Sequence, residues 1–387
     1  MKFIRNKINS KKYIDNVFSV SSKAKNDPSG INASLGCLFD EEKKIYIFDS
    51  IYKNEKNVSS KINASYANPI GNNDYLRTIK DYILNNHVKN NNQIIATSGG
   101  TGAIHIGIRT CLDEGDSIVL PNIGWGNYSV MADEMNLNII NYDIYNINSL
   151  LNIIDEAKGK VFIIINSPCH NPCGHSYSYD EWKTLINKMN TCDKEVIILN
   201  DIAYIDYADE ECKKYFDLFN NINDNVLILI AHSCSKAFSY YGKRVGALIA
   251  INNDMNFLDT YINYCTRVAR TTWSNVNNGA MQNIADVLTN HREEYELEKK
   301  KAVNMLQERA NLFLKQADTC GLEYYPYTNG FFITLKFNDL NKRDNVFDKL
   351  VANHIYTVKV NKGLRIGICS LSFNEIDGLA NKIKSLL

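Results

Sequence analysis

Short apolar runs, each about the length of one β-strand, constrain the fold of this 387-residue chain more than any other feature. Several of them are apolar throughout instead of alternating with polar residues, which is typical of strands covered on both faces. Helical stretches at residues 101–112 and 179–189 lie between such runs. The pattern predicts an α/β fold with a mainly parallel, doubly wound sheet. The predicted strands are residues 93–97, 117–120, 137–140, 161–165, 196–200, 226–230 and 246–250.

The last third of the chain has a different pattern. Residues 279–317 look helical, carry many charges and contain no proline, which is long for one globular helix. We expect a kink there or a helix that spans two domains. Residues 322–387 mix a strand at 331–337 with helices at 343–353 and 374–385, which predicts a separate small α+β layer.

Composition excludes several classes of protein. Lys and Arg together number 43, as do Asp and Glu, so the net charge is zero and neither nucleic acid nor a membrane surface is an expected partner. Residues 1–20 hold no apolar stretch of signal-peptide length, and no window is long enough for a membrane span. We therefore expect a cytoplasmic protein with reduced, buried cysteines.

Cys169 and Cys173 flank a histidine but lack a second ligand pair, so no metal site is expected.

One segment carries the strongest chemical signal. Ser233, Ser235 and Lys236 lie within four residues, and Arg244 follows eight residues after the lysine. A lysine amine forms a Schiff base with an aldehyde, and two hydroxyls and a guanidinium can hold a phosphate. Pyridoxal 5′-phosphate, a phosphorylated aldehyde, fits this set of groups. A polar loop with one surface lysine would explain the segment equally well on its own.

Further polar residues follow the ends of other predicted strands, where ligands bind in sheets of this kind. Gly99, Gly100 and Thr101 open a helix, and such a turn suits a phosphate or simply tight packing. Trp125 stands between two glycines, where it either offers a flat surface to a ligand or belongs to the core.

Two more strand ends add groups suited to a pyridine ring. Asn171 is held by flanking prolines and a glycine, although a structural turn would also explain that pattern. Asp201 closes an apolar strand, where a buried carboxylate needs a partner such as a protonated ring nitrogen. Tyr204 could hydrogen-bond a phenolic oxygen of the same ring. The joint occurrence of these motifs in this order is more informative than any one of them.

In this order the motifs resemble those of fold-type I pyridoxal-phosphate enzymes, and more closely the aspartate and aromatic subgroup of class I aminotransferases. The resemblance runs from about residue 32 to the C-terminus. It implies an N-terminal arm and part of the small domain at 1–44, a large cofactor-binding domain at 45–302 and a small domain at 303–387. It also implies a homodimer with shared active sites.

The resemblance assigns a role to each motif. It makes Lys236 the Schiff-base lysine and general base, and Arg365 the group that binds the substrate's α-carboxylate. Tyr66 would reach the phosphate of the partner subunit, and Arg270 would bind the distal carboxylate of a substrate there. Arg267 is an alternative to Arg270, three residues away. The other implied ligands are Gly99, Gly100, Thr101, Ser233, Ser235 and Arg244 for the phosphate, Trp125, Asn171, Asp201 and Tyr204 for the ring, and Gly36, Trp125 and Asn171 for the substrate.

Three departures from the subgroup pattern bear on the substrate more than on the cofactor. Tyr128 stands where a histidine is usual, behind the ring-pairing aspartate. Cys173 replaces a threonine, and Val276 with Asn277 replaces a proline pair.

The resemblance implies an aminotransferase that moves the amino group of aspartate, glutamate or an aromatic amino acid to a 2-oxo acid by a ping-pong mechanism. A carbon–sulfur β-lyase would use the same cofactor and is the alternative, although a clamp for a distal carboxylate has no role in it. A cofactor-binding regulator of DNA is a third possibility. The chain has no room for a helix-turn-helix before residue 32 and no basic stripe, which argues against it.

Overall fold

A seven-stranded sheet forms the centre of the computed structural model, which describes residues 16–387. Its strand order is β2-β8-β7-β6-β5-β3-β4, and only β8 runs antiparallel to its neighbours. Every predicted strand of this region is present, so the expected mainly parallel α/β sheet is confirmed. The strands are β2 (Asn92–Thr97), β3 (Ser117–Pro121), β4 (Asn138–Tyr142), β5 (Val161–Asn166), β6 (Val196–Asp201), β7 (Val226–Ser233) and β8 (Gly246–Ile251).

Both faces of this sheet are covered, which explains its continuous apolar runs. Along β5, Ile163 and Ile165 belong to one buried cluster while Phe162 and Ile164 belong to the other. Alternate side chains of a strand point to opposite faces, so each face packs into a core of its own. The surrounding helices are α4 (Asn73–Leu84), α5 (Gly99–Cys111), α6 (Asn127–Glu134), α7 (Ile147–Glu156), α8 (Tyr179–Thr191), α9 (Cys234–Ala237) and α10 (Met255–Thr272), with the 3₁₀ segments η2 (Ile205–Tyr207) and η3 (Glu210–Asn221).

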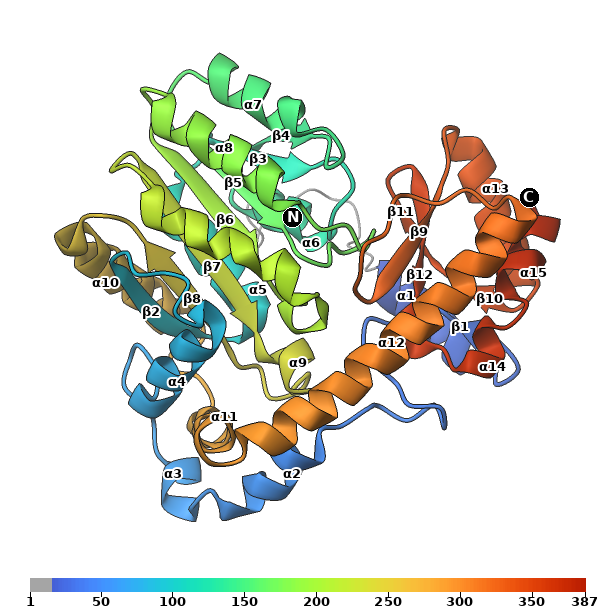
Figure 1. Ribbon diagram of the computed structural model, residues 1–387, viewed down its shortest axis with the longest axis horizontal. Helices are drawn as coiled ribbons and strands as arrows, with labels where there is room; N and C mark the ends of the chain where they lie inside the picture. Colours follow the sequence, from blue (N-terminus) through green and yellow to red (C-terminus); the bar gives the residue numbers. More distant parts are fainter. Residues whose placement is uncertain (1–15) are drawn as a thin grey trace, which may run out of the picture.

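The helical stretch predicted at 279–317, where a kink or a domain-spanning helix was expected, is interrupted and forms two helices. α11 (Asn278–Asn290) ends at His291, and α12 (Arg292–Cys320) starts immediately after it. The backbone of His291 lies at φ −131° and ψ 23°, outside helical values, so the break falls on this residue. Figure 1 shows α12 running from α11, beside the central sheet, to a smaller group of strands and helices.

That smaller group contains a three-stranded antiparallel sheet in the order β11-β12-β9. The N-terminal strand β1 pairs in parallel with β10, so the start of the chain joins the C-terminal elements. The helix expected at 374–385 is wrong, because Gly378 adopts φ +74° and separates two short helices. The elements are α1 (Asn16–Lys25), β1 (Ile31–Asn32), β9 (Phe332–Lys336), α13 (Leu340–Ala352), β10 (Ile355–Tyr356), β11 (Val358–Val360), β12 (Gly363–Gly367), η4 (Ile368–Ser370), α14 (Phe373–Ile376) and α15 (Leu379–Ser385).

Three short elements lie in the chain between the two parts, at the bottom of the view in Figure 1: α2 (Asp49–Asn54), η1 (Glu55–Asn57) and α3 (Ser60–Ala64). The predicted domain boundaries at 44 and 302 stay a prediction, and the first fifteen residues of the predicted arm lie outside the described residues. The ten cysteines are unpaired, five of them buried and five only partly so, which corrects the expectation that all are buried. Within residues 16–387, no helix is long and apolar enough to cross a membrane.

Candidate active site

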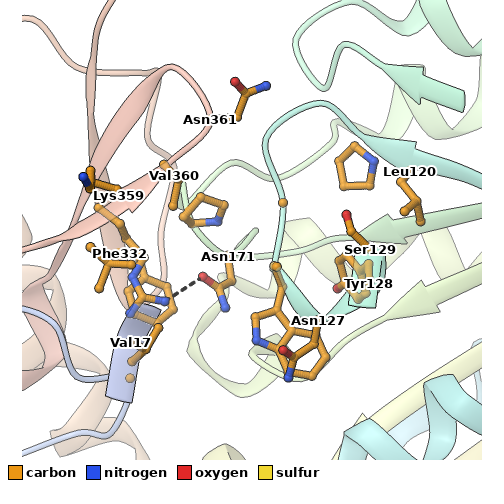
Figure 2. A pocket seen from close by; sticks show the side chains of 18 of the residues that line it. Val17, Leu120, Asn127, Tyr128, Ser129, Asn171, Phe332, Lys359, Val360 and Asn361 are labelled. Carbon is orange, nitrogen blue, oxygen red and sulfur yellow. Dashed lines mark hydrogen bonds between the residues drawn. The ribbon is translucent and has the colours of Figure 1, made fainter. Parts of the chain in front are cut away.

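A cavity of about 920 Å³ lies between the central sheet and the three-stranded sheet. Figure 2 shows Asn171 near its middle, with Phe332 and Val360 on one side and Asn127 and Tyr128 on the other. The structure therefore brings residues far apart in sequence to one site. The predicted site residues that line the cavity are Gly36, Trp125, Asn171, Tyr204, Lys236 and Arg365.

Lys236 lies on α9, directly after the end of β7. Its Nζ donates a hydrogen bond to the carbonyl oxygen of Gly36 at 2.8 Å and lies 4.7 Å from the centre of the Tyr241 ring. Burial lowers the pKa of Lys236, and the positive charges of Arg365 and Arg244 act in the same direction. A larger fraction of this amine is therefore neutral, which is the form that attacks a carbonyl carbon.

Asp201 ends β6 and is 5% exposed. Its Oδ2 accepts a hydrogen bond from the Tyr128 hydroxyl at 2.6 Å, and its Oδ1 accepts one from the backbone N–H of Ala203 at 3.1 Å. Burial raises the pKa of Asp201 to about 6, while the bond from Tyr128 opposes that rise. Burial and the neighbouring carboxylate raise the pKa of Tyr128, so the phenol is the donor. The sequence marked Tyr128 as a departure but did not predict this contact.

Arg365 reaches the cavity from β12, and its contacts there include two hydrogen bonds and one aromatic ring. It donates through Nη1 to Asn171 Oδ1 at 3.2 Å and through Nη2 to the carbonyl oxygen of Ser34 at 2.7 Å. Its guanidinium carbon lies 4.3 Å from the centre of the Phe332 ring. A buried guanidinium fixed in this way is suited to a carboxylate, which it can bind through two parallel hydrogen bonds.

Five predicted phosphate ligands form a second cluster around the start of α5. Arg244 donates through Nη1 to Ser235 Oγ at 3.1 Å, and Ser235 N–H donates to Ser233 Oγ at 3.3 Å. A Cβ atom on Gly99 would lie 2.5 Å from Arg244 Nη2, and one on Gly100 would lie 3.0 Å from Ser233 Cβ. A Cβ on Gly99 would displace the end of the Arg244 side chain and one on Gly100 would press on Ser233, and Gly99 also has φ +69°, a backbone conformation that favours glycine. Backbone N–H groups at a helix start favour an anion.

Three further predicted residues are exposed and lie outside both the cavity and the phosphate cluster. Thr101 is exposed on α5, although its two glycine neighbours are buried. Tyr66 is 88% exposed, and Arg270 is exposed at the end of α10, where its Nη1 donates to Ser274 Oγ at 3.0 Å. Asn275 hydrogen-bonds both backbone groups of Ala67, each at 3.1 Å, so the segments that carry Tyr66 and Arg270 adjoin.

Sequence reasoning missed several residues at the cavity. Phe332 supports Arg365, and Tyr241 lies beside the amine of Lys236. Val17 and Phe18, on α1, line the cavity from the N-terminal side. The only sequence signal was their apolar character, which core residues share.

Comparison with known proteins assigns the chain to a family. Residues 31–383 match the family model "Aminotransferase class I and II". The aspartate aminotransferase of Pseudomonas aeruginosa is 24% identical over 265 residues, which are 64% of this chain and 65% of that protein, so the alignment spans under two thirds of that relative.

Solved structures are similar over the whole chain. An aminotransferase from Anaerococcus prevotii has a TM-score of 0.95 and 28% identity, covering 100% of this chain and 99% of that one. An aromatic-amino-acid aminotransferase from Burkholderia pseudomallei, covalently bound to pyridoxal phosphate, has a TM-score of 0.82 and 21% identity over 99% of this chain and 100% of that one. Because the family model covers residues 31–383, the chain belongs to the class I and II aminotransferases, in agreement with the fold and the aminotransferase family predicted from its sequence.

Proposed function

We propose that this protein transfers the amino group of an acidic or aromatic L-amino acid to a 2-oxo acid, with pyridoxal phosphate held beside the cavity. One observation carries the proposal: the amine of Lys236 and the guanidinium of Arg365 line the same cavity. A nucleophilic amine beside a carboxylate-binding arginine is the arrangement that an α-amino acid requires.

The residues present fit this cofactor. Asp201 is a buried carboxylate with lone pairs left for a ring nitrogen, and Trp125 lines the cavity with its indole. Around the start of α5, the hydroxyls of Ser233 and Ser235 and the guanidinium of Arg244 would hold the phosphate. When bound, pyridoxal phosphate supplies an aldehyde carbon that accepts amines and a ring that draws electrons from the substrate's α-carbon.

The chain's own groups would orient the substrate and move its proton. Arg365 would bind the α-carboxylate, with its position fixed by Asn171, the Ser34 carbonyl and the Phe332 ring. The amine of Lys236 would then remove the proton from the α-carbon, which its lowered pKa favours. A carboxylate at Asp201, kept charged by the Tyr128 hydroxyl, would hold the cofactor ring in its cationic form.

We also propose that the active unit is a homodimer. Tyr66 and Arg270 are both exposed, carried on adjoining segments, and neither lines this chain's own cavity. Their placement supports an arrangement in which each serves the cavity of the partner subunit. In that arrangement Arg270 would bind the distal carboxylate of an acidic substrate.

A half-reaction screen tests the substrate class. Each amino acid is added singly to the holoenzyme, and absorbance records conversion of the cofactor from its aldehyde to its amine form. Aspartate, glutamate or an aromatic amino acid should convert it, whereas a Lys236→Ala control should not. Failure of all of these substrates would contradict the proposed class, and pyruvate release from a cysteine conjugate without any oxo acid would indicate the β-lyase instead.

A further inference from the structure

Three tyrosine hydroxyls converge on the backbone that carries Lys236. They come from η2, α12 and α2, elements far apart in the sequence. Each donates a hydrogen bond to a carbonyl oxygen of residues 236–239, so this segment is held by side chains from three directions. The bonds run from Tyr207 to Lys236 at 3.2 Å, from Tyr295 to Ala237 at 2.8 Å and from Tyr52 to Ser239 at 3.0 Å.

The segment needs such partners because α9 is only four residues long. The backbone N–H groups of Phe238 and Tyr240 both donate to the carbonyl oxygen of Cys234, the first residue of the helix. The carbonyl groups at the end of a helix have no partner within it, and a buried carbonyl without a partner costs free energy. Ala237 and Phe238 are buried, so water does not donate hydrogen bonds to the carbonyl groups here. The tyrosine hydroxyls act as the donors instead.

Tyr295 connects this segment to the helix that spans the two parts of the protein. It lies in the first turn of α12 and has no exposed surface. Its ring packs at 5.0 Å from the ring of Phe238 and at 5.5 Å from that of Phe48. Burial raises the pKa of Tyr295 and of Tyr207, so both phenols stay protonated and can donate at any working pH.

We propose that Tyr207 and Tyr295 are positioning residues that fix the backbone of Lys236 and so set where its amine lies in the cavity. Through Tyr295 the position of α12 is linked to that of the amine. Tyr52 makes a weaker contribution, because it is only half-buried and contacts a residue three positions beyond the lysine. The inference rests on the proposed role of Lys236.

Tyr295→Phe and Tyr207→Phe test it, since each keeps the ring and removes one hydroxyl. With the lysine less constrained, kcat should fall about twofold to tenfold, the range expected for one hydrogen bond, while KM changes little. The amine should also gain contact with water, so its lowered pKa should move back toward the ordinary value. That pKa is read from the pH dependence of the rate at which full-length apoprotein incorporates pyridoxal phosphate.

Tyr324→Phe is the matched control, because the Tyr324 hydroxyl donates to Asp318 at 2.7 Å near the opposite end of α12. Tyr324→Phe should leave kcat and the pH profile at wild-type values. Tyr52→Phe should change kcat and the pKa of the amine by less than Tyr207→Phe and Tyr295→Phe, but by more than the control. If Tyr207→Phe and Tyr295→Phe behave like the control, the proposal is overturned, even when their Tm is lower. Should one of the two fail to fold, the other decides. Failure of the wild-type chain to incorporate the cofactor would instead contradict the proposed function.

Discussion

Replacing Tyr128 by phenylalanine tests how the charge of Asp201 is maintained. The substitution removes the hydroxyl that donates to Asp201 at 2.6 Å and leaves the ring that packs edge-on against Trp125. The backbone N–H of Ala203 then remains as the other donor to this carboxylate. Because burial already raises the pKa of Asp201 to about 6, loss of a donor to the charged form should raise it further.

The size of the effect follows from the energy of the lost bond. A hydrogen bond to a charged group is worth about 1.5–3 kcal/mol, and one pKa unit corresponds to about 1.4 kcal/mol. The pKa of Asp201 should therefore rise by about one to two units, to roughly 7–8. At pH 7 this residue would change from mostly charged to between about half and mostly protonated.

The sign of the pH dependence is set by the direction of the shift. The pKa of Asp201 is higher in the folded protein than its ordinary value of 3.8, so the folded state binds this proton more tightly. Stability should then fall as pH rises from about 4 to the folded pKa, and in Tyr128→Phe the fall should continue to about pH 8. The variant should thus lose about 1.5–3 kcal/mol at pH 8 and clearly less at pH 5.

Urea unfolding of the apoprotein at both pH values measures this difference. Tyr142→Phe is a suitable control, because Tyr142 is equally buried but donates to the backbone carbonyl of Ile164, at 3.0 Å. The loss in free energy of unfolding caused by Tyr142→Phe should be the same at pH 5 and pH 8. An equal loss at both pH values in Tyr128→Phe would refute the assignment of Tyr128 as the donor that keeps Asp201 charged.

Three further substitutions test other parts of the site. Gly99→Ala places a Cβ 2.5 Å from Arg244 Nη2 on a residue with φ +69°. Equilibrium dialysis should therefore show that pyridoxal phosphate binds at least about tenfold more weakly. Unchanged affinity would mean that the phosphate binds elsewhere. Arg365→Lys removes the paired hydrogen bonds of a guanidinium, and steady-state kinetics should show KM for amino acids raised about tenfold with a smaller change in kcat. Arg270→Ala should reduce kcat/KM for aspartate at least about tenfold more than for phenylalanine, and equal losses would mean that Arg270 does not contact the side chain.

The central sheet could be predicted because its strands are buried on both faces. Residues 161–165, for example, are all apolar, because their side chains enter one or the other of two buried cores. Such a run can be recognised as a strand without knowing which core each side chain enters. The ends of helices depend on the backbone conformation of single residues, which the pattern of apolar residues does not predict. A kink was one of two expectations for residues 279–317, but its position at His291 was not predicted, nor was the left-handed backbone of Gly378.

Site residues at strand ends were predictable for a related reason. Parallel strands end at one edge of a sheet, so Asn171, Trp125 and Lys236 lie around one cavity as expected. Contacts between distant segments were not predictable. The bond from Lys236 to Gly36 joins residues 200 positions apart, and the bond from Tyr128 to Asp201 joins residues 73 apart. Nothing in local pattern or propensity records such pairs, because they depend on how the whole chain packs.

With 29 residues, α12 is a long helix whose two ends lie in different parts of the protein. At 1.5 Å of rise per residue it is about 43 Å long, so tilting it by one degree about its first turn would move its far end by roughly 0.7 Å. A small rigid tilt at its first turn, which packs among aromatic rings, would thus give a larger displacement where α12 meets α15. A stiff rod of this length lets a sub-ångström change at one end open or narrow a gap at the other without any loop having to refold.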